Sequence, residues 1–143
     1  MRVGFIGLGT MGLPMAYSLR QNGFDVLGWD VDVGAQERFE YFAESPEMLA
    51  EHCDAFITML PEGRHVTEVH DRLLDAGVTD HCLFIDSSTI DVETTRRLAA
   101  RLGEAGHGFV DAPVSGGSEG AAIGLLSFMI GGAAGDIERA RPV

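Results

Sequence analysis

Three glycines near the N-terminus have the spacing Gly7-x-Gly9-x-x-Gly12, between a short apolar run and an amphipathic segment. In a strand-to-helix turn the first such glycine permits the tight turn, and the second lets a pyrophosphate approach the backbone. The third lets helix and strand pack closely. The helix N-terminus adds free N–H groups and the positive end of the helix dipole. This segment therefore predicts a dinucleotide phosphate loop.

An acidic residue, Asp30, lies 18 residues beyond Gly12, where a second apolar run ends. A carboxylate there accepts hydrogen bonds from the adenosine ribose of NAD and repels the 2′-phosphate of NADP. Asp32 is the rival acid, but its position favours a loop or helix N-cap. NAD is thus predicted as the cofactor, with NADP less favoured. Arg38 is close enough in sequence to keep NADP as an alternative.

A second glycine-rich segment, "DAPVSGGSEGAAIG", spans residues 111–124. A P-loop is excluded because that motif needs a lysine, and all ten basic residues of this chain are arginines. The Ser115-Gly116-Gly117 turn could surround a small carboxylate with backbone N–H groups and a hydroxyl. As a bare pattern, a flexible loop is the favoured reading.

Short apolar runs alternate along the chain with amphipathic segments. Strands apolar on both faces and separated by helices indicate an α/β fold of the Rossmann type, doubly wound, with a mainly parallel sheet and helices on both faces. The predicted strands are Val3–Leu8, Phe24–Trp29, Ala55–Leu60, Cys82–Ile85, Gly108–Val110 and Leu126–Ile130.

Helices are predicted from apolar periodicity and from their end signals. Ser45 and Asp91 are expected N-caps, and Gly77 is expected to end a helix. The predicted helices are Met11–Asn22, Val33–Phe42, Ser45–His52, one with Val66, Val69, Leu73 and Leu74 on one face, and one with Thr95, Leu98, Ala99 and Leu102.

The composition limits the class of protein. A chain of 143 residues without an internal linker fits one domain over 1–143. A net charge of −12 argues against a nucleic acid or an anionic membrane as partner. No apolar run reaches the roughly 18 residues of a membrane span.

Isolated cysteines and histidines give no metal site. Cys53 and Cys82 lack ligand spacing and are expected as buried free thiols in a reducing compartment, so we expect a cytoplasmic protein. The histidines also lack ligand spacing. The histidines expected at the surface are His52, His70, His81 and His107.

Several segments together resemble the β-hydroxyacid dehydrogenase family. "FIGLGTMGLPMA" resembles its N-terminal signature G-x-G-x-M-G-x-x-M-[SA], and "MLP", "IDSSTID", "DAPVSGG" and "FMIGG" resemble its later blocks, in order. "IDSSTID" with "DAPVSGG" is most similar to the 3-hydroxyisobutyrate dehydrogenases. Tartronate semialdehyde reductases and related short-chain reductases are close alternatives, whereas 6-phosphogluconate dehydrogenases share only the shorter "SGG-x-EGA" portion.

This resemblance implies NAD(P)-dependent oxidation of a small 3-hydroxyacid substrate to its semialdehyde, or the reverse reaction. His65 would lie near the cofactor, with an exposed helix histidine as the alternative, and Met11 could instead pack under the loop. The implied cofactor contacts are Gly7, Leu8, Gly9, Thr10, Met11, Gly12, Asp30, Leu60, Pro61, His65 and Thr89, with Thr89 beside the nicotinamide half. The implied contacts of the substrate carboxylate are Ser115, Gly116 and Gly117.

The family's general acid/base is a lysine on a helix that follows this domain. Because the chain has no lysine, the resemblance implies that no catalytic residue lies within it and that the lysine lies beyond Val143. We therefore expect a truncated cofactor-binding part, without the helical C-terminal domain through which family members form homo-oligomers, and without normal turnover. The alternative is a non-catalytic dinucleotide-binding module.

Overall fold

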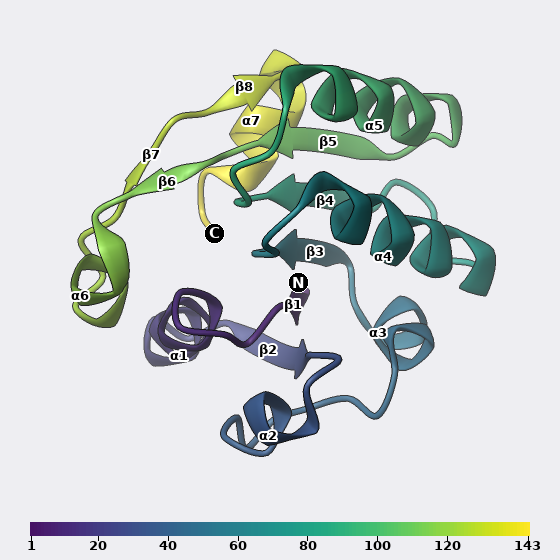
Figure 1. Ribbon diagram of the computed structural model, residues 1–143. Helices are drawn as coiled ribbons and strands as arrows, with labels where there is room; N and C mark the ends of the chain where they lie inside the picture. The colour runs from purple at the N-terminus through teal and green to yellow at the C-terminus, as the bar shows by residue number, and fades with distance from the viewer.

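A six-stranded sheet forms the centre of the computed structural model, which describes residues 1–143 (Figure 1). The strand order is β2-β1-β3-β4-β5-β8, and all neighbours pair in parallel except β5 and β8. This mainly parallel sheet confirms the predicted fold class. Its strands are β1 (Arg2–Ile6), β2 (Asp25–Trp29), β3 (Ala55–Thr58), β4 (Leu83–Asp86), β5 (Gly108–Asp111) and β8 (Gly131–Gly132).

The helices begin and end largely where the sequence signals predict. The Ser45 hydroxyl accepts from the Met48 amide, the Asp91 carboxylate accepts from the Thr94 amide, and Gly77 ends α4 in the left-handed region at φ +82°. The helices are α1 (Gly12–Gln21), α2 (Val33–Gln36), α3 (Pro46–His52), α4 (Gly63–Ala76), α5 (Val92–Glu104), α6 (Gly117–Ala122) and α7 (Ala134–Ala140).

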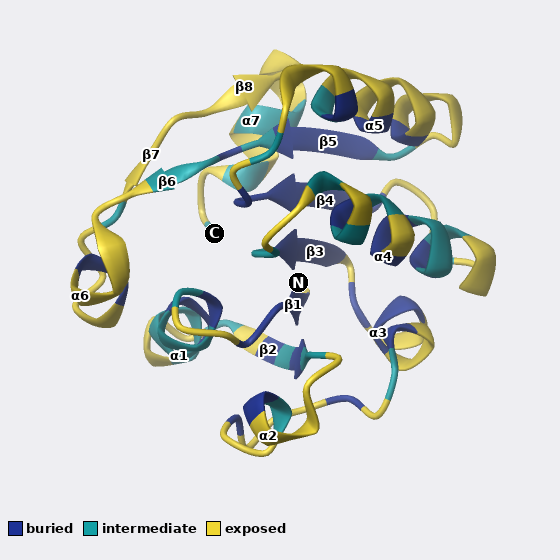
Figure 2. Ribbon diagram, viewed as in Figure 1, coloured by how far each residue is buried: buried dark blue, intermediate teal, exposed yellow.

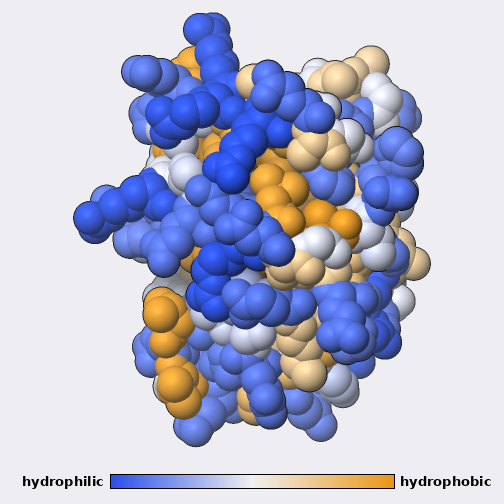
Figure 3. Space-filling view, turned by 90° about the vertical axis from the view of Figure 1, so that its right-hand side faces the viewer, coloured by the Kyte–Doolittle hydropathy of each residue, from blue (hydrophilic) through white to orange (hydrophobic).

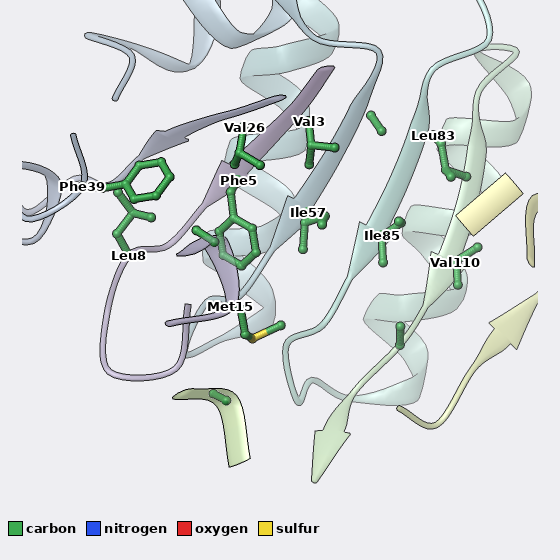
Figure 4. Close-up of a cluster of buried hydrophobic side chains, with 14 of the residues drawn as sticks. Val3, Phe5, Leu8, Met15, Val26, Phe39, Ile57, Leu83, Ile85 and Val110 are labelled. Atoms are coloured by element: carbon green, nitrogen blue, oxygen red, sulfur yellow. The ribbon is translucent and has the colours of Figure 1, made fainter. Parts of the chain in front are cut away.

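Two apolar clusters, one on each face of the sheet, hold the layers together. Figure 4 shows the first cluster, in which Phe5, Ile57 and Ile85 project from neighbouring strands on the same face of the sheet. On this face Met15 of α1 and Ala121 of α6 belong to the cluster, and Ile137 of α7 packs against it. The second cluster packs α3, α4 and α5 on the opposite face, around Phe56 and Phe84. All residues of β3 and β4 are buried (Figure 2), as expected for central strands covered on both faces.

The predicted helix over Val33–Phe42 is wrong beyond its first turn, α2. The chain instead returns to the edge of β2, where the Gly28 amide donates to the Tyr41 carbonyl and the Ala43 amide donates to the Gly28 carbonyl, both at 2.8 Å. Phe42 and Gly28 form a single parallel bridge. This pairing with β2 and the complete burial of Phe39 override the local helix preference.

The predicted strand Leu126–Ile130 is also only partly present. Ser127–Phe128 forms β7, which pairs antiparallel with β6 (Val114–Ser115) in a separate two-stranded ribbon. The chain then joins the main sheet as β8, antiparallel to β5. The apolar run predicted a core strand, but all of its residues except the partly buried Leu126 are exposed, on an arm that extends from β5 to α6 (Figures 1 and 2).

The prediction that His70 lies at the surface is wrong. Its side chain is 1% exposed and packs edge-on against Phe84, with ring centroids 5.1 Å apart. The reason is its position on α4: it follows Val66 by four residues and precedes Leu73 by three, so it lies on the inner face. Cys53 and Cys82 are buried and free, as predicted.

The surface combines polar and charged side chains with several exposed large hydrophobic residues. Figure 3 shows one largely hydrophilic face with apolar atoms confined to small areas. None of the helices has the length and apolar character needed to cross a lipid bilayer. No three His, Cys, Asp or Glu side chains are close enough together to hold a metal ion.

Candidate functional site

A cavity of about 520 Å³ lies where β1, β2 and β3 end at their carboxyl edge. Three loops and the first turns of α4 contribute its walls. In α/β sheets of this kind ligands bind at the carboxyl ends of the strands, at the point where the strand order reverses. Seven predicted cofactor residues line the cavity: Gly7, Gly9, Thr10, Asp30, Leu60, Pro61 and His65.

The glycine loop is shaped by two close backbone approaches. Gly7 has φ +98°, and a Cβ there would lie 2.3 Å from the Met59 carbonyl oxygen. A Cβ on Gly12 would lie 1.8 Å from the Gly7 carbonyl oxygen, so α1 can approach β1 only through a glycine. These contacts agree with the predicted roles of the two residues. A Cβ on Gly9 would meet no protein atom within 4 Å, so the protein itself does not require a glycine there.

Asp30 ties the end of β2 to the glycine loop. Its Oδ2 accepts a hydrogen bond from the Leu8 amide at 2.6 Å, and its Oδ1 accepts one from the Asp32 amide at 2.8 Å. Each carboxylate oxygen keeps a further acceptor position, and Asp30 lines the cavity. The Asp32 carboxylate instead caps α2 by accepting from the Gly34 amide, as predicted.

The cavity contains both signs of charge. Arg38 and Arg72 line it together with Asp30, and His65 adds an imidazole ring. Arg72 pairs with the Glu47 carboxylate at 2.9 Å and lies 5.5 Å above the ring of Trp29. The site therefore presents hydrogen-bond acceptors at the end of β2 and cationic side chains around it.

Some predicted site residues lie elsewhere. The Leu8 side chain is completely buried in the first cluster, so only its backbone reaches the loop, and Met11 packs against that cluster. Thr89 is exposed on the β4–α5 loop and does not line the cavity. The segment 115–117 is exposed on the arm, and it does not line the cavity either.

The sequence prediction missed cavity residues on α4. Glu68 and Arg72 follow His65 at helical spacings of three and seven residues, so one face of α4 carries all three. That spacing is the signal that could have identified them once His65 was considered. Trp29, directly before Asp30, was also missed.

A second cavity, of about 470 Å³, lies on the face covered by α1, α6 and α7. Fourteen of its eighteen lining residues are hydrophobic, and it contains neither the glycine loop nor Asp30. Its chemistry does not suit phosphates or a ribose, so the polar cavity at the carboxyl edge is the candidate site.

The fold and this cavity define a dinucleotide-binding domain of the Rossmann class. More particularly, the chain belongs to the family described as the NAD binding domain of 6-phosphogluconate dehydrogenase, whose family model matches residues 2–143. This places the chain with the NAD-binding domains of the hydroxyacid dehydrogenases that the sequence motifs indicated.

Several relatives of this chain are named as 3-hydroxyisobutyrate dehydrogenases. The chain is 43% identical to the mitochondrial enzyme of Mus musculus over 91% of this chain and 41% of the mouse protein. It is 42% identical to the Pseudomonas aeruginosa enzyme over 99% of this chain and 49% of that protein. The chain thus spans less than half the length of these relatives.

Solved structures of related proteins have the same fold as this chain. A Mycobacterium tuberculosis 3-hydroxyisobutyrate dehydrogenase, described with L-serine, has a TM-score of 0.93 at 40% identity, over 99% of this chain and 50% of that one. A structure described as Psf3 in complex with NADP+ and 2-OPP has a TM-score of 0.90 at 28% identity, over 98% and 52%. Neighbours of this fold therefore include one with NADP.

Proposed function

We propose that this chain binds NAD in the cavity at the carboxyl edge of the sheet. One observation carries the proposal: seven residues predicted from separate sequence segments line a single polar cavity of about 520 Å³. The glycine at position 9 supports the proposal. No protein atom requires a glycine there, whereas the close approach of a pyrophosphate to the backbone would require one.

In this proposal Asp30 receives the adenosine ribose hydroxyls on the acceptor positions that Leu8 and Asp32 leave free. The pyrophosphate lies over Gly9 and the N-terminal turn of α1, where backbone N–H groups face it. The nicotinamide half lies toward Leu60 and Pro61. When bound, the cofactor supplies the hydride chemistry, and the protein supplies binding and orientation.

NAD is the proposed cofactor in preference to NADP, and we expect at least tenfold tighter binding of NAD. The Asp30→Asn variant should weaken NAD binding about tenfold, or about 1.4 kcal/mol, and leave NADP binding unchanged or improved. It keeps a neutral acceptor but removes the charge that repels a 2′-phosphate. Trp29 lines the cavity, so its fluorescence can follow both titrations, with calorimetry as a second measurement.

The matched control is Arg38→Gln, because Arg38 lines the same cavity as Asp30 but carries the opposite charge. NAD affinity should stay within twofold in this variant. Tighter binding of NADP than of NAD by the unaltered chain would overturn the role given to Asp30.

For the reaction, we propose that the chain is the cofactor-binding part of an enzyme that oxidises 3-hydroxyisobutyrate or a similar short 3-hydroxyacid to its semialdehyde. The names of the relatives support this class, and L-serine, named with one solved relative, is itself a 3-hydroxyacid. In this proposal Thr89 lies beside the nicotinamide half, and residues 115–117 hold the substrate carboxylate. A semialdehyde reductase of the same family is the alternative.

The 143-residue chain alone should show 3-hydroxyisobutyrate oxidation at the background rate while it binds NAD. The reason is that the chain contains no lysine to act as the proton acceptor expected for this family. NADH formation at 340 nm, measured with excess substrate, tests this. Robust turnover would show that another residue of this chain accepts the proton, whereas absence of NAD binding would favour a different module altogether.

For the compartment, the cytoplasm remains our proposal, because both cysteines are free and buried. The mammalian relatives are named as mitochondrial enzymes.

A further inference from the structure

We propose that the buried carboxyl group of Asp86 is a positioning residue, which through Thr58 and Ser88 fixes the two loops that face the nicotinamide half of the cofactor. The inference rests on the proposed binding of NAD. It assigns a role to a group that the dinucleotide motifs leave unexplained, at the ends of β3 and β4.

The network joins two strand ends and one loop. Asp86 Oδ1 accepts a hydrogen bond from the Thr58 hydroxyl at 2.9 Å and another from the Ser88 amide at 3.0 Å. The Ser88 hydroxyl in turn accepts from the Leu60 amide at 2.9 Å. Thr58, Asp86 and Ser88 are each no more than 1% exposed, so these bonds are shielded from water.

The network ends at a wall of the cavity. Leu60 lines the cavity, and its Cδ2 lies 3.0 Å from the position that a Cβ on Gly7 would occupy. Pro61 follows Leu60 into the cavity wall, and Thr89 follows Ser88 on the next loop. A shift of the Leu60 backbone would therefore move the surface that a bound dinucleotide meets beyond the glycine loop.

The sheet order assigns this wall to the nicotinamide half. Asp30 marks the adenosine end beside β2, and β3 and β4 lie on the other side of β1. A dinucleotide that crosses the carboxyl edge from β2 places its second nucleotide toward the loops that follow β3 and β4. The network thus lies under one half of the ligand and away from the other.

Stability alone does not account for the carboxyl group. Its Oδ2 is buried without any hydrogen-bond partner, and burial raises the pKa of Asp86 above its ordinary value in spite of hydrogen bonds from Ser88 and Thr58. A buried polar atom left unpaired destabilises a fold, and an apolar residue of similar size would avoid this. The geometry that Asp86 imposes on the two loops is what it contributes.

The test compares Ser88→Ala with Ser87→Ala. Both serines are 1% exposed and adjacent, but the Ser87 hydroxyl has no hydrogen-bond partner, which makes it a matched control. Calorimetry with NAD and with ADP, which contains only the adenosine diphosphate part, separates the two halves of the ligand. Ser88→Ala should bind NAD about tenfold more weakly than the unaltered chain and bind ADP within twofold of it.

Ser87→Ala should bind both ligands as the unaltered chain does. Asp86→Ala, which removes the acceptor of both hydrogen bonds, should weaken NAD binding at least as much as Ser88→Ala does. Asp86→Asn, which keeps an acceptor oxygen for both donors, should retain NAD affinity within about threefold. Amide hydrogen exchange should become faster at Leu60 in Ser88→Ala and stay unchanged in Ser87→Ala. Thr58→Val, which removes the other hydroxyl contact, repeats the test if Ser88→Ala does not fold.

Two results overturn the inference while leaving NAD binding intact. Equal losses of NAD and ADP affinity in Ser88→Ala would indicate general damage to the site, and unchanged NAD affinity would show that the network does not position the loops. If the unaltered chain binds neither NAD nor ADP, the proposed function itself fails, and this inference fails with it.

Discussion

Replacing Gly12 by alanine should lower the free energy of unfolding by about 3 kcal/mol or more. The added Cβ would lie 1.8 Å from the Gly7 carbonyl oxygen and 3.0 Å from the ring of Phe5, and the first of these is backbone that no rotamer change can move. Overpacking of this kind typically costs 1–3 kcal/mol, and occasionally more. Alanine favours a helix over glycine by only about 1 kcal/mol, so the steric term dominates. Urea denaturation followed by circular dichroism measures the change.

Two other glycines provide matched controls. Gly135 lies in α7 and Gly9 in the loop, and a Cβ at either position meets no atom within 4 Å. Gly135→Ala should leave the protein as stable or up to about 1 kcal/mol more stable. Gly9→Ala should keep its stability within about 0.5 kcal/mol while weakening NAD binding. A Gly12→Ala variant as stable as the unaltered chain would contradict the close packing of α1 on β1.

The glycine loop and Asp30 could be predicted because each depends on local backbone geometry at fixed sequence separation. Gly7 needs a positive φ and Gly12 a close approach, and both requirements act within one strand-to-helix unit. The central strands could be predicted for a similar reason, since burial on both faces leaves continuous apolar runs in the sequence.

The arm and the return to β2 could not be predicted, because their structure is decided by pairing with distant segments. The local sequence of residues 126–130 does not indicate that Phe128 pairs with Val114 instead of joining the main sheet. In the same way, the Gly28–Phe42 bridge replaces helix with an extended backbone. Propensity is a weak guide where such tertiary pairing competes with it.

The site was only partly predictable for a related reason. Motif positions identify residues whose backbone must approach the ligand, but not side chains that a neighbouring helix brings in. Glu68 and Arg72 reach the cavity because one side of α4 borders it, and Arg72 is paired there with Glu47 of α3. The helical spacing from His65 places these residues on one face of α4, but the packing of α4 against distant segments decides which face borders the cavity.

A histidine without hydrogen-bond partners should make the stability of this protein strongly dependent on pH. Both ring nitrogens of His70 are buried and unpartnered between α4 and the aromatic rings of Phe84 and Phe109. Burial, with a smaller effect of the Arg101 charge, lowers the pKa of His70 from 6.5 to about 3. The folded protein therefore keeps the ring neutral at a pH where the unfolded chain protonates it.

The sign of the effect follows from proton uptake. Below pH 6.5 the unfolded state binds a proton that the folded state does not, so stability falls with decreasing pH until about pH 3. The slope is about 1.4 kcal/mol per pH unit for one proton. Relative to His70→Leu, the unaltered chain should therefore lose about 3 kcal/mol between pH 6.5 and pH 4. Urea unfolding at several pH values in this range measures the difference.

At pH 7.5 His70→Leu should be at least as stable as the unaltered chain, because the larger of two opposing effects favours leucine. Leucine removes two unpaired nitrogens, but it also removes the edge-to-face contact with Phe84, worth about 0.5–1.5 kcal/mol. His107, whose pKa burial also lowers, is present in both proteins and cancels in the comparison. The control His52→Gln changes an exposed ring, and its profile should follow that of the unaltered chain. If the profile of His70→Leu is also parallel to it, the ring is hydrated or paired in solution, and its burial does not control acid stability.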